Sequence, residues 1–185
     1  MADDFGRVLD RNEIHDVILG YSRSLDRKDW QGVMAAFHED ATDDHGEYQG
    51  DIPGMIDWIA SRHAAIEQSM HFIGNMAVEF LDDGRALVET YYQAHFTLRD
   101  DAHQARTLWL NNADGAGAKL VVLGRYIDIF AKRPKWRIAE RTNIYESVLA
   151  LEQQPTSRNP CNHWSRRDQD DMYFKIRNRL AASAP

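Results

Sequence analysis

Apolar residues recur with helical spacing near the start of the sequence, which indicates a first helix that ends close to Asp26. Its apolar positions follow the i, i+3, i+4, i+7, i+11 pattern of one helix face: Ile14, Val17, Ile18, Tyr21 and Leu25. Asp10 is a suitable N-cap for this helix, and Glu13 would complete a capping box with it. The same periodicity predicts a short second helix from Asp29 and a third helix over residues 52–68.

From Met70 onward the pattern changes to that of strands. Long strands are predicted over residues 70–81, 86–98, 120–131 and 136–149, with shorter ones over about 106–111 and within 41–50. Asp82-Asp83-Gly84-Arg85 joins the first two long strands, because Asp-Gly accepts the positive φ of a tight turn. Helices followed by long antiparallel strands predict an α+β fold, with the helices packed on one face of a curved sheet.

The tail differs from the rest of the chain in composition. Residues 153–160 are loop-like and residues 165–180 favour a helix. We therefore expect a domain over residues 1–150 and a C-terminal extension over 151–185. The extension mixes basic and aromatic side chains, as nucleic-acid-binding tails do, but three aspartates interrupt its positive charge: Asp168, Asp170 and Asp171. We expect it to act as a lid or as an arm in an oligomer.

Composition disfavours several classes of function. The chain has 185 residues, 43% of them hydrophobic, and a formal net charge of −7, which fits one domain and disfavours nucleic-acid binding. The single cysteine, Cys161, excludes an internal disulfide and a thiolate-rich zinc site. No stretch reaches the roughly 18 apolar residues of a membrane span, and the acidic N-terminus lacks the order of a secretory signal. We therefore expect a cytoplasmic protein without a membrane partner.

Histidines and aspartates gather between the second and third predicted helices. This group carries donor atoms suited to a metal ion: His38, Asp40, Asp43, Asp44 and His45. Their spacing fixes no coordination geometry. We interpret the group as a solvated turn and expect no metal site.

Four other residues stand out by their context. Asp26 is expected at the C-terminal end of the first helix, where the helix dipole raises the pKa of a carboxylate unless another group compensates. Tyr21, five residues earlier, lies on about the same side of that helix. His71 opens the first long strand among apolar neighbours, which is also the context of an ordinary core histidine. Arg141 is expected to be largely buried in the last strand, so it requires an anionic partner or ligand.

The order of these residues resembles the SnoaL-like branch of the nuclear transport factor 2-like superfamily. The matching stretches lie between Arg11 and Val148: 13–26 (EIHDVILGYSRSLD), 29–37, 70–75 (MHFIGN), 88–95, 124–126 (GRY) and 136–141 (WRIAER). The resemblance implies a cone-shaped, curved, mostly antiparallel sheet wrapped around helices and enclosing an apolar pocket. Members of the superfamily include polyketide cyclases, scytalone and bile-acid dehydratases, a hexachlorocyclohexane dehydrochlorinase, lyases of lignin-derived aromatics, and small subunits of ring-hydroxylating dioxygenases.

The resemblance also implies a site. By position, the family's catalytic pair corresponds to Asp26 and His71, its dehydratase tyrosine to Tyr21 and its last-strand arginine to Arg141. Asp26 would fix the tautomer of His71, which would take a proton from the substrate, while Tyr21 and Arg141 would stabilise developing charge. Six aromatic residues are candidates either for the pocket lining or for ordinary core: Trp58, Phe72, Tyr91, Tyr92, Phe96 and Trp109. An aromatic lining favours a hydrophobic ring substrate.

We therefore expect a lyase or isomerase that needs no cofactor and catalyses β-elimination, isomerisation or cyclisation of an aromatic or alicyclic ring compound, as a homodimer or homotrimer. Two alternatives stay open. The chain is a non-catalytic pocket protein or assembly subunit similar to a dioxygenase small subunit, or a cyclase-type enzyme in which Asp26 is itself the base. The residues identify neither the substrate nor the leaving group.

Overall fold

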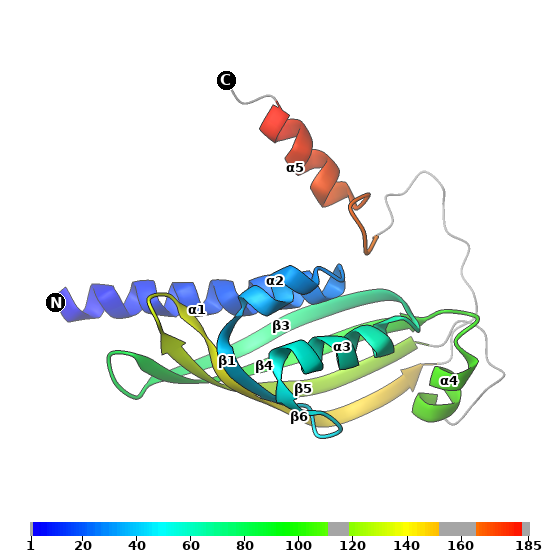
Figure 1. Ribbon diagram of the computed structural model, residues 1–185, viewed down its shortest axis with the longest axis horizontal. Coiled ribbons are helices and arrows are strands. Elements are labelled where there is room, and N and C mark those ends of the chain that lie inside the picture. Colours follow the sequence, from blue (N-terminus) through cyan, green and yellow to red (C-terminus); the bar gives the residue numbers. More distant parts are fainter. Residues whose placement is uncertain (1, 111–118, 152–165, 183–185) are drawn as a thin grey trace.

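The computed structural model describes residues 2–110, 119–151 and 166–182, and its architecture is the predicted α+β fold (Figure 1). Three helices and a short strand pair come first, and four long strands follow. The elements are α1 (Ala2–Asp26), α2 (Trp30–Ala35), β1 (Phe37–Asp44), β2 (Gln49–Asp51), α3 (Ile52–His63), β3 (Ile66–Phe80), β4 (Arg85–Leu98), α4 (His103–Leu110), β5 (Lys119–Lys132), β6 (Trp136–Leu151) and α5 (Met172–Ala182).

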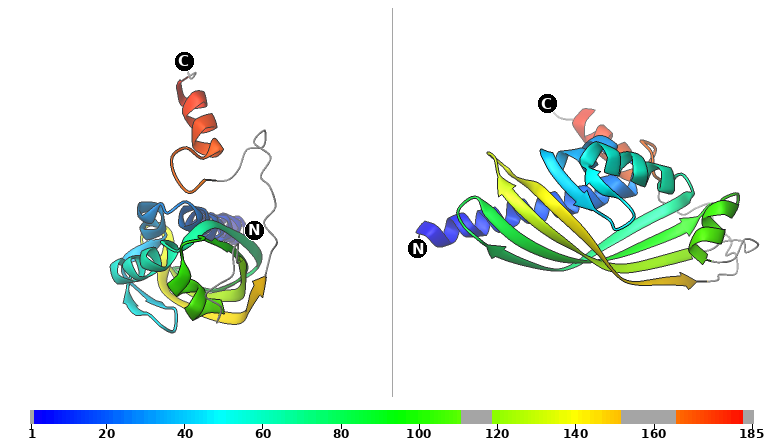
Figure 2. Two further views of the ribbon diagram at one scale, coloured as in Figure 1. Left: turned by 90° about the vertical axis from the view of Figure 1, so that its right-hand side faces the viewer. Right: turned by 60° about the horizontal axis from the view of Figure 1, so that its bottom comes forward.

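The six strands of the described residues belong to one curved sheet, in the order β2-β1-β6-β5-β4-β3. The four long strands pair antiparallel in sequence order. β1 instead runs parallel to β6, which places Asp43 opposite Arg141. Figure 2 shows that the sheet is strongly curved, with the N-terminal helices beside it. The sheet is thus mostly antiparallel and wrapped around the helices, as expected.

The apolar face of α1 packs into the core, and its residues Ile14, Ile18, Tyr21 and Leu25 are all buried. The predicted start of the helix is wrong. α1 begins at Ala2, so Asp10 and Glu13 lie inside the helix and do not cap it. Their carboxylates instead accept hydrogen bonds from the indole and the backbone N–H of Trp136 at the start of β6. They therefore tie the helix to the sheet.

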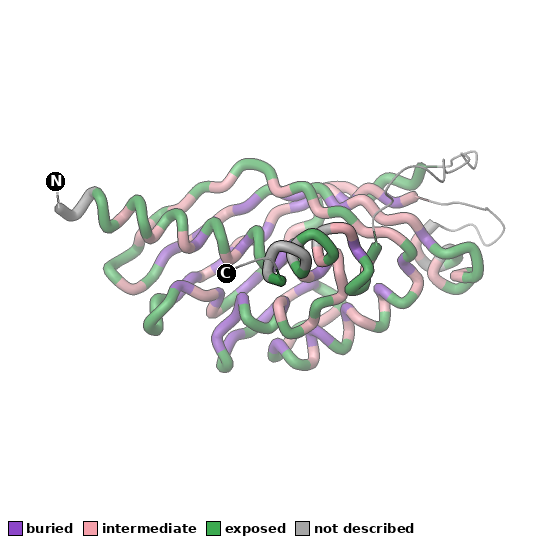
Figure 3. Tube along the Cα trace, turned by 90° about the horizontal axis from the view of Figure 1, so that it is seen from above, coloured by how far each residue is buried: buried purple, intermediate pink, exposed green. Residues whose placement is uncertain are grey.

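Buried residues gather between the helices and the concave face of the sheet (Figure 3). The described residues of α1 before Ile14 are exposed or half-buried. The predicted turn after β3 is present, and Asp82 Oδ1 accepts a hydrogen bond from the Gly84 N–H at 2.9 Å. In the part of the chain that the structure describes, no helix is long and apolar enough to span a membrane.

Several elements also differ from the prediction in their bounds or type. The third helix ends at His63 rather than at residue 68, because β3 begins at Ile66. The predicted short strand over 106–111 is wrong, since α4 occupies His103–Leu110 and the Thr107 hydroxyl bonds back to the His103 carbonyl. A segment this short has too few apolar repeats to separate the two periods. The tail helix begins at Met172 rather than at residue 165. Residues 111–118, 153–160, Cys161 and residue 165 lie outside the described residues.

Candidate active site

Asp26 and His71 meet where the last turn of α1 faces the first half of β3. Asp26 Oδ1 accepts hydrogen bonds from His71 Nδ1 at 2.7 Å and from Ser69 Oγ at 2.6 Å. Asp26 Oδ2 accepts a third bond, from the backbone N–H of His71 at 2.9 Å. Ser69 and His71 are two positions apart on one strand, so both side chains point to the same face. With Asp26 accepting, Nδ1 of His71 carries the proton and Nε2 carries the lone pair.

The electrostatics of Asp26 differ from the expectation for a carboxylate at a helix C-terminus. Burial raises its pKa, but the hydrogen bonds from His71 and Ser69 outweigh burial and hold the pKa below its ordinary value of 3.8. The helix end is also compensated. Arg167, from the segment before α5, donates to the carbonyl oxygens of Asp26 at 2.8 Å and Leu25 at 3.3 Å. A cation at this end offsets the negative pole of the helix.

Arg167 also binds the start of β3 and the end of α3. Its guanidinium donates to the carbonyl of Ile66 at 3.0 Å and to Nδ1 of His63 at 2.6 Å. Burial lowers the pKa of His63 to about 2, and the charge of Arg167 adds to this shift. Burial likewise lowers the pKa of Arg167 to about 10. His63 is therefore neutral and accepts the bond from Arg167.

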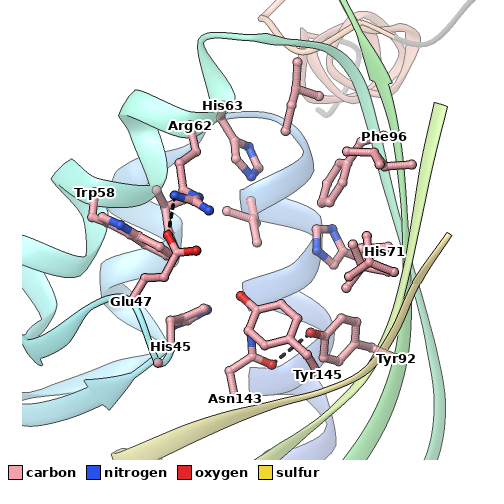
Figure 4. A pocket seen from close by; sticks show the side chains of 18 of the residues that line it. His45, Glu47, Trp58, Arg62, His63, His71, Tyr92, Phe96, Asn143 and Tyr145 are labelled. Atoms are coloured by element: carbon pink, nitrogen blue, oxygen red, sulfur yellow. Dashed lines mark hydrogen bonds and ion pairs between the residues drawn. The ribbon is translucent and has the colours of Figure 1, made fainter. Parts of the chain in front are cut away.

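A cavity of about 610 Å³ lies between the helices and the concave face of the sheet, and His71 is part of its wall (Figure 4). This volume is in the range of small-molecule sites. Apolar and aromatic side chains form much of its wall: Leu25, Trp58, Ile59, Phe96, Trp109 and Val122. Polar groups also face it: His45, His63, Tyr92, Asn143 and Tyr145.

Four of the six aromatic residues proposed from the sequence line this cavity: Trp58, Tyr92, Phe96 and Trp109. Phe72 and Tyr91 do not. They are 62% and 46% exposed, because each neighbours an inward-facing residue, and side chains alternate between the two faces of a strand. We therefore correct the prediction that Phe72 and Tyr91 line the pocket.

Tyr21 lines the cavity, whereas Arg141 lies behind it. Arg141 is 2% exposed and donates to both carboxylate oxygens of Asp128 at 2.7 Å. Asp128 is thus the anionic partner that a buried arginine requires. The guanidinium carbon of Arg141 is 4.3 Å from the ring centre of Tyr21 and 4.1 Å from that of Tyr126. Arg141, expected to stabilise developing charge, is thus not among the residues that line the cavity.

The hydroxyl of Tyr21 keeps its proton. Burial raises the pKa of Tyr21 to about 12, although the charge of Arg141 opposes the shift. Among the described residues, this hydroxyl has no hydrogen-bond partner. The hydroxyl therefore keeps a proton that it can donate in a hydrogen bond.

Sequence analysis missed a second group of polar residues on β4 and β6. The Tyr92 hydroxyl donates to Asn143 Oδ1 at 2.8 Å, and the Tyr92 ring stacks on Tyr126 at 4.3 Å between centres. Gly124 makes room for this arrangement, because a Cβ there would lie 2.6 Å from the Tyr92 hydroxyl and 2.4 Å from the Ile144 carbonyl. The alternation along β6, counted from Arg141, was the signal that could have placed Asn143 on the inner face.

The predicted solvated turn is wrong for three of its members, since His38, Asp43 and His45 are 7%, 2% and 8% exposed. Nδ1 of His45 bonds to Oδ1 of Asp43. His38 bonds instead to the Ala131 carbonyl, and Asp40 pairs with Arg133 at the surface. Within the described ranges, no cluster of three or more His, Cys, Asp or Glu residues is arranged to hold a metal ion.

Known structures share this fold. A candidate scytalone dehydratase from Novosphingobium aromaticivorans is 15% identical, with a TM-score of 0.64 over 89% of this chain and 100% of that one. A hexachlorocyclohexane dehydrochlorinase from Novosphingobium barchaimii is 12% identical, with a TM-score of 0.69 over 84% and 99%. The beta subunit of a candidate aromatic-ring-hydroxylating dioxygenase from N. aromaticivorans is 21% identical, with a TM-score of 0.57 over 77% and 92%.

Sequence comparison with curated proteins finds no match. The model of one protein family, the SnoaL-like domain, matches residues 6–142. This match covers α1 through the first part of β6, which includes Tyr21, Asp26, His71 and Arg141. The chain belongs to the SnoaL-like domain family.

Proposed function

We propose that the protein is a lyase that needs no cofactor and catalyses β-elimination on a small hydrophobic ring compound. The observation that carries this proposal is the Asp26–His71 pair in the wall of a largely apolar cavity. Asp26 holds the Nδ1 proton of His71, so Nε2 is the base. It takes a proton from a ring carbon next to an electron-withdrawing group. The C–H electron pair forms the double bond, and the leaving group departs from the neighbouring carbon with its own pair.

Tyr21 supplies a hydrogen-bond donor for this reaction. Its ring is part of the cavity wall and its hydroxyl keeps its proton, so we expect the hydroxyl to donate to the substrate carbonyl or to the leaving group as charge develops. Arg141 acts as a positioning residue. Its guanidinium is held by Asp128 and packs on the Tyr21 ring, so it fixes that ring and places a positive charge behind it.

The cavity supports a ring substrate. Trp58, Phe96 and Trp109 offer aromatic faces and edges, which favour a flat or nearly flat hydrophobic molecule. Two structural neighbours with this fold are named for eliminations, a dehydratase and a dehydrochlorinase.

The test is turnover of two simple ring probes, 3-hydroxycyclohexanone and 3-chlorocyclohexanone, which both yield cyclohex-2-enone. We expect His71→Asn to lower turnover by about 10²-fold or more. His95→Asn is the matched control, because His95 lies on β4 between the inward-facing Ala94 and Phe96 and so points away from the cavity. Equal rates for His71→Asn and wild type would refute the proposal.

The cyclase-type alternative, with Asp26 as the base, fits the geometry less well. Both carboxylate oxygens of Asp26 already accept hydrogen bonds from His71 or Ser69. Its lowered pKa also makes it a weaker base. A pH–rate profile decides between them, because carboxylate and imidazole bases ordinarily titrate about two units apart.

The assembly-subunit alternative is favoured by one observation, the structural match to a dioxygenase beta subunit. It predicts a stable complex with a larger partner. Our proposal instead expects a homodimer or homotrimer, since the outer face of β3 and β4 exposes Met70, Phe72 and Tyr91. Sedimentation velocity of wild type and Phe72→Asp separates these cases. A wild-type chain that is monomeric at every concentration would contradict self-association.

A further inference from the structure

We propose that His45, held by Asp43, is a second proton-transfer residue of the cavity, which delivers a proton to the departing oxygen while His71 removes the proton from carbon. This inference rests on the elimination proposed above and adds a residue to it. It predicts that the cavity favours substrates that lose water over substrates that lose a halide.

The geometry of His45 repeats that of His71. Asp43 binds Nδ1 of His45 as Asp26 binds Nδ1 of His71. His45 follows β1 directly and lines the same cavity, with its ring 5.4 Å from that of Trp58. Figure 4 shows the two imidazoles on different sides of the cavity, His45 beside α3 and His71 on the sheet. Within the described part of the chain, Nε2 of neither ring has a hydrogen-bond partner, so both are open to a molecule between them.

The charges behind His45 are arranged for an imidazolium. Asp43, Arg141 and Asp128 lie in one row across β1, β6 and β5. Arg141 gives Nε and Nη2 to Asp128, and among the described residues neither its Nη1 nor Asp43 Oδ2 has a hydrogen-bond partner. Two buried carboxylates, those of Asp43 and Asp128, thus share this row with one guanidinium, which is bonded to Asp128. Because an uncompensated buried charge is costly, a second proton on His45 completes the balance.

The charges around His71 differ from those around His45 and favour a neutral imidazole. Asp26 is the one carboxylate bonded to it among the described residues, and the guanidinium of Arg167 binds the carbonyl of the same Asp26. The charge of the Asp26 carboxylate opposes the lowering of the Arg167 pKa, so this carboxylate has a cation near it without a charged imidazole. Arg62 and Glu47, the other charged pair on the His45 side, bond to each other at 2.8 Å. The two dyads are therefore unequal: His71 is set up as the base and His45 as the acid.

The step balances with these two groups. His71 Nε2 takes the proton of the C–H bond, whose electrons form the carbon–carbon double bond. The C–O bond breaks with its electron pair on oxygen, and that oxygen takes the Nε2 proton of His45, so that water leaves. His71 ends with two protons and His45 with one. Exchange with solvent after product release restores both rings.

A pair of probes isolates the role of His45. A departing hydroxide needs a proton, whereas chloride leaves without one. We expect His45→Gln to slow water loss from 3-hydroxycyclohexanone about 10²-fold more than it slows chloride loss from 3-chlorocyclohexanone. His71→Asn is expected to slow both reactions. Equal losses on the two probes, or unchanged water loss, would overturn the role of His45. If His71→Asn still lowers both rates, the proposed function survives that outcome.

A second measurement needs no turnover. ¹⁵N NMR of the histidine rings in the full-length protein reports which nitrogen carries the proton. His45 is expected to keep a proton on Nδ1 and to gain one on Nε2 as the pH is lowered, and Asp43→Asn is expected to abolish the preference for Nδ1. A His45 ring that keeps a single proton on Nε2 would overturn the inference. If wild type turns over neither probe, the proposed function fails, and this measurement alone decides whether His45 is built as a proton donor.

Discussion

Arg167 donates a hydrogen bond to the backbone carbonyl of Asp26 at 2.8 Å, across 141 positions of sequence. The segment before α5 therefore holds the helix end that carries the acid of the dyad. The ion pair of Arg27 with Asp171, at 3.4 Å, fastens the same segment a second time. We propose that this part of the C-terminal extension holds Asp26 in position against Ser69 and His71 of β3.

Arg167→Ala is expected to lower the free energy of unfolding by about 1–3 kcal/mol, because charged hydrogen bonds to buried carbonyls are lost. It should also speed proteolysis of the C-terminal extension and reduce turnover through misplacement of Asp26. Urea unfolding and limited proteolysis measure these effects. Arg166→Ala is the control, since Arg166 is exposed and pairs with Asp168 at the surface. Equal unfolding free energies and equal proteolysis rates for the two variants would show that Arg167 does not stabilise this part of the chain.

His63 is expected to make the protein less stable in mild acid. Its pKa is about 2 in the folded chain, against an ordinary value of 6.5, so the unfolded chain binds one proton more between these values. The contribution of neutral His63 to stability is therefore complete above about pH 6.5. It is lost as the pH falls, by up to about 1.4 kcal/mol per pH unit. His63→Gln should remove this slope, and His15→Gln, at an exposed position of α1, should keep it. Unfolding titrations from about pH 7 to pH 4 test this.

Asp26 is expected to affect the stability of the protein at a lower pH than His63 does. Its folded pKa lies below the ordinary 3.8, so its contribution to stability is present above that value and disappears as the pH falls through the folded pKa. Asp26→Asn should therefore show a flatter loss of stability than wild type below about pH 4. The control is Asp57→Asn at an exposed position of α3. Parallel curves for Asp26→Asn and wild type would contradict the lowered pKa.

Two glycines should respond in opposite ways to alanine. Gly124→Ala places a methyl group against the Tyr92 hydroxyl and the Ile144 carbonyl, so a loss of about 1–3 kcal/mol is expected from overpacking. Gly20→Ala, in the middle of α1 with nothing within 4 Å of the new Cβ, should gain up to about 1 kcal/mol from helix propensity. Thermal unfolding of both variants measures the difference. A neutral Gly124→Ala would mean that Tyr92 is free to move.

Local patterns predicted much of this fold. The stripe from Ile14 to Leu25 marks α1, and the Asp-Gly turn marks the β3–β4 hairpin, because both depend on residues close together in sequence. The meeting of Asp26 with His71 was expected only from the resemblance to a family, since periodicity cannot pair residues 45 positions apart.

The parts of the site that were missed depend on long-range packing. Arg167 is one of several arginines in the tail, and the composition of the tail does not distinguish Arg167 from Arg166. Asp43, to which His45 is bonded, lies in the parallel pairing of β1 with β6, which a polar, aspartate-rich segment does not suggest. Phe72 was misplaced for a simpler reason: alternation from His71 already assigns it to the outer face.

The bonds from Arg167 to the first helix and to β3 all end on main-chain oxygens, those of Leu25, Asp26 and Ile66. Every amino acid supplies such an oxygen. Exchanging the side chain of Asp26 therefore leaves the anchoring of the tail unchanged, and the acid of the dyad is free to diverge among descendants of this chain without detaching it.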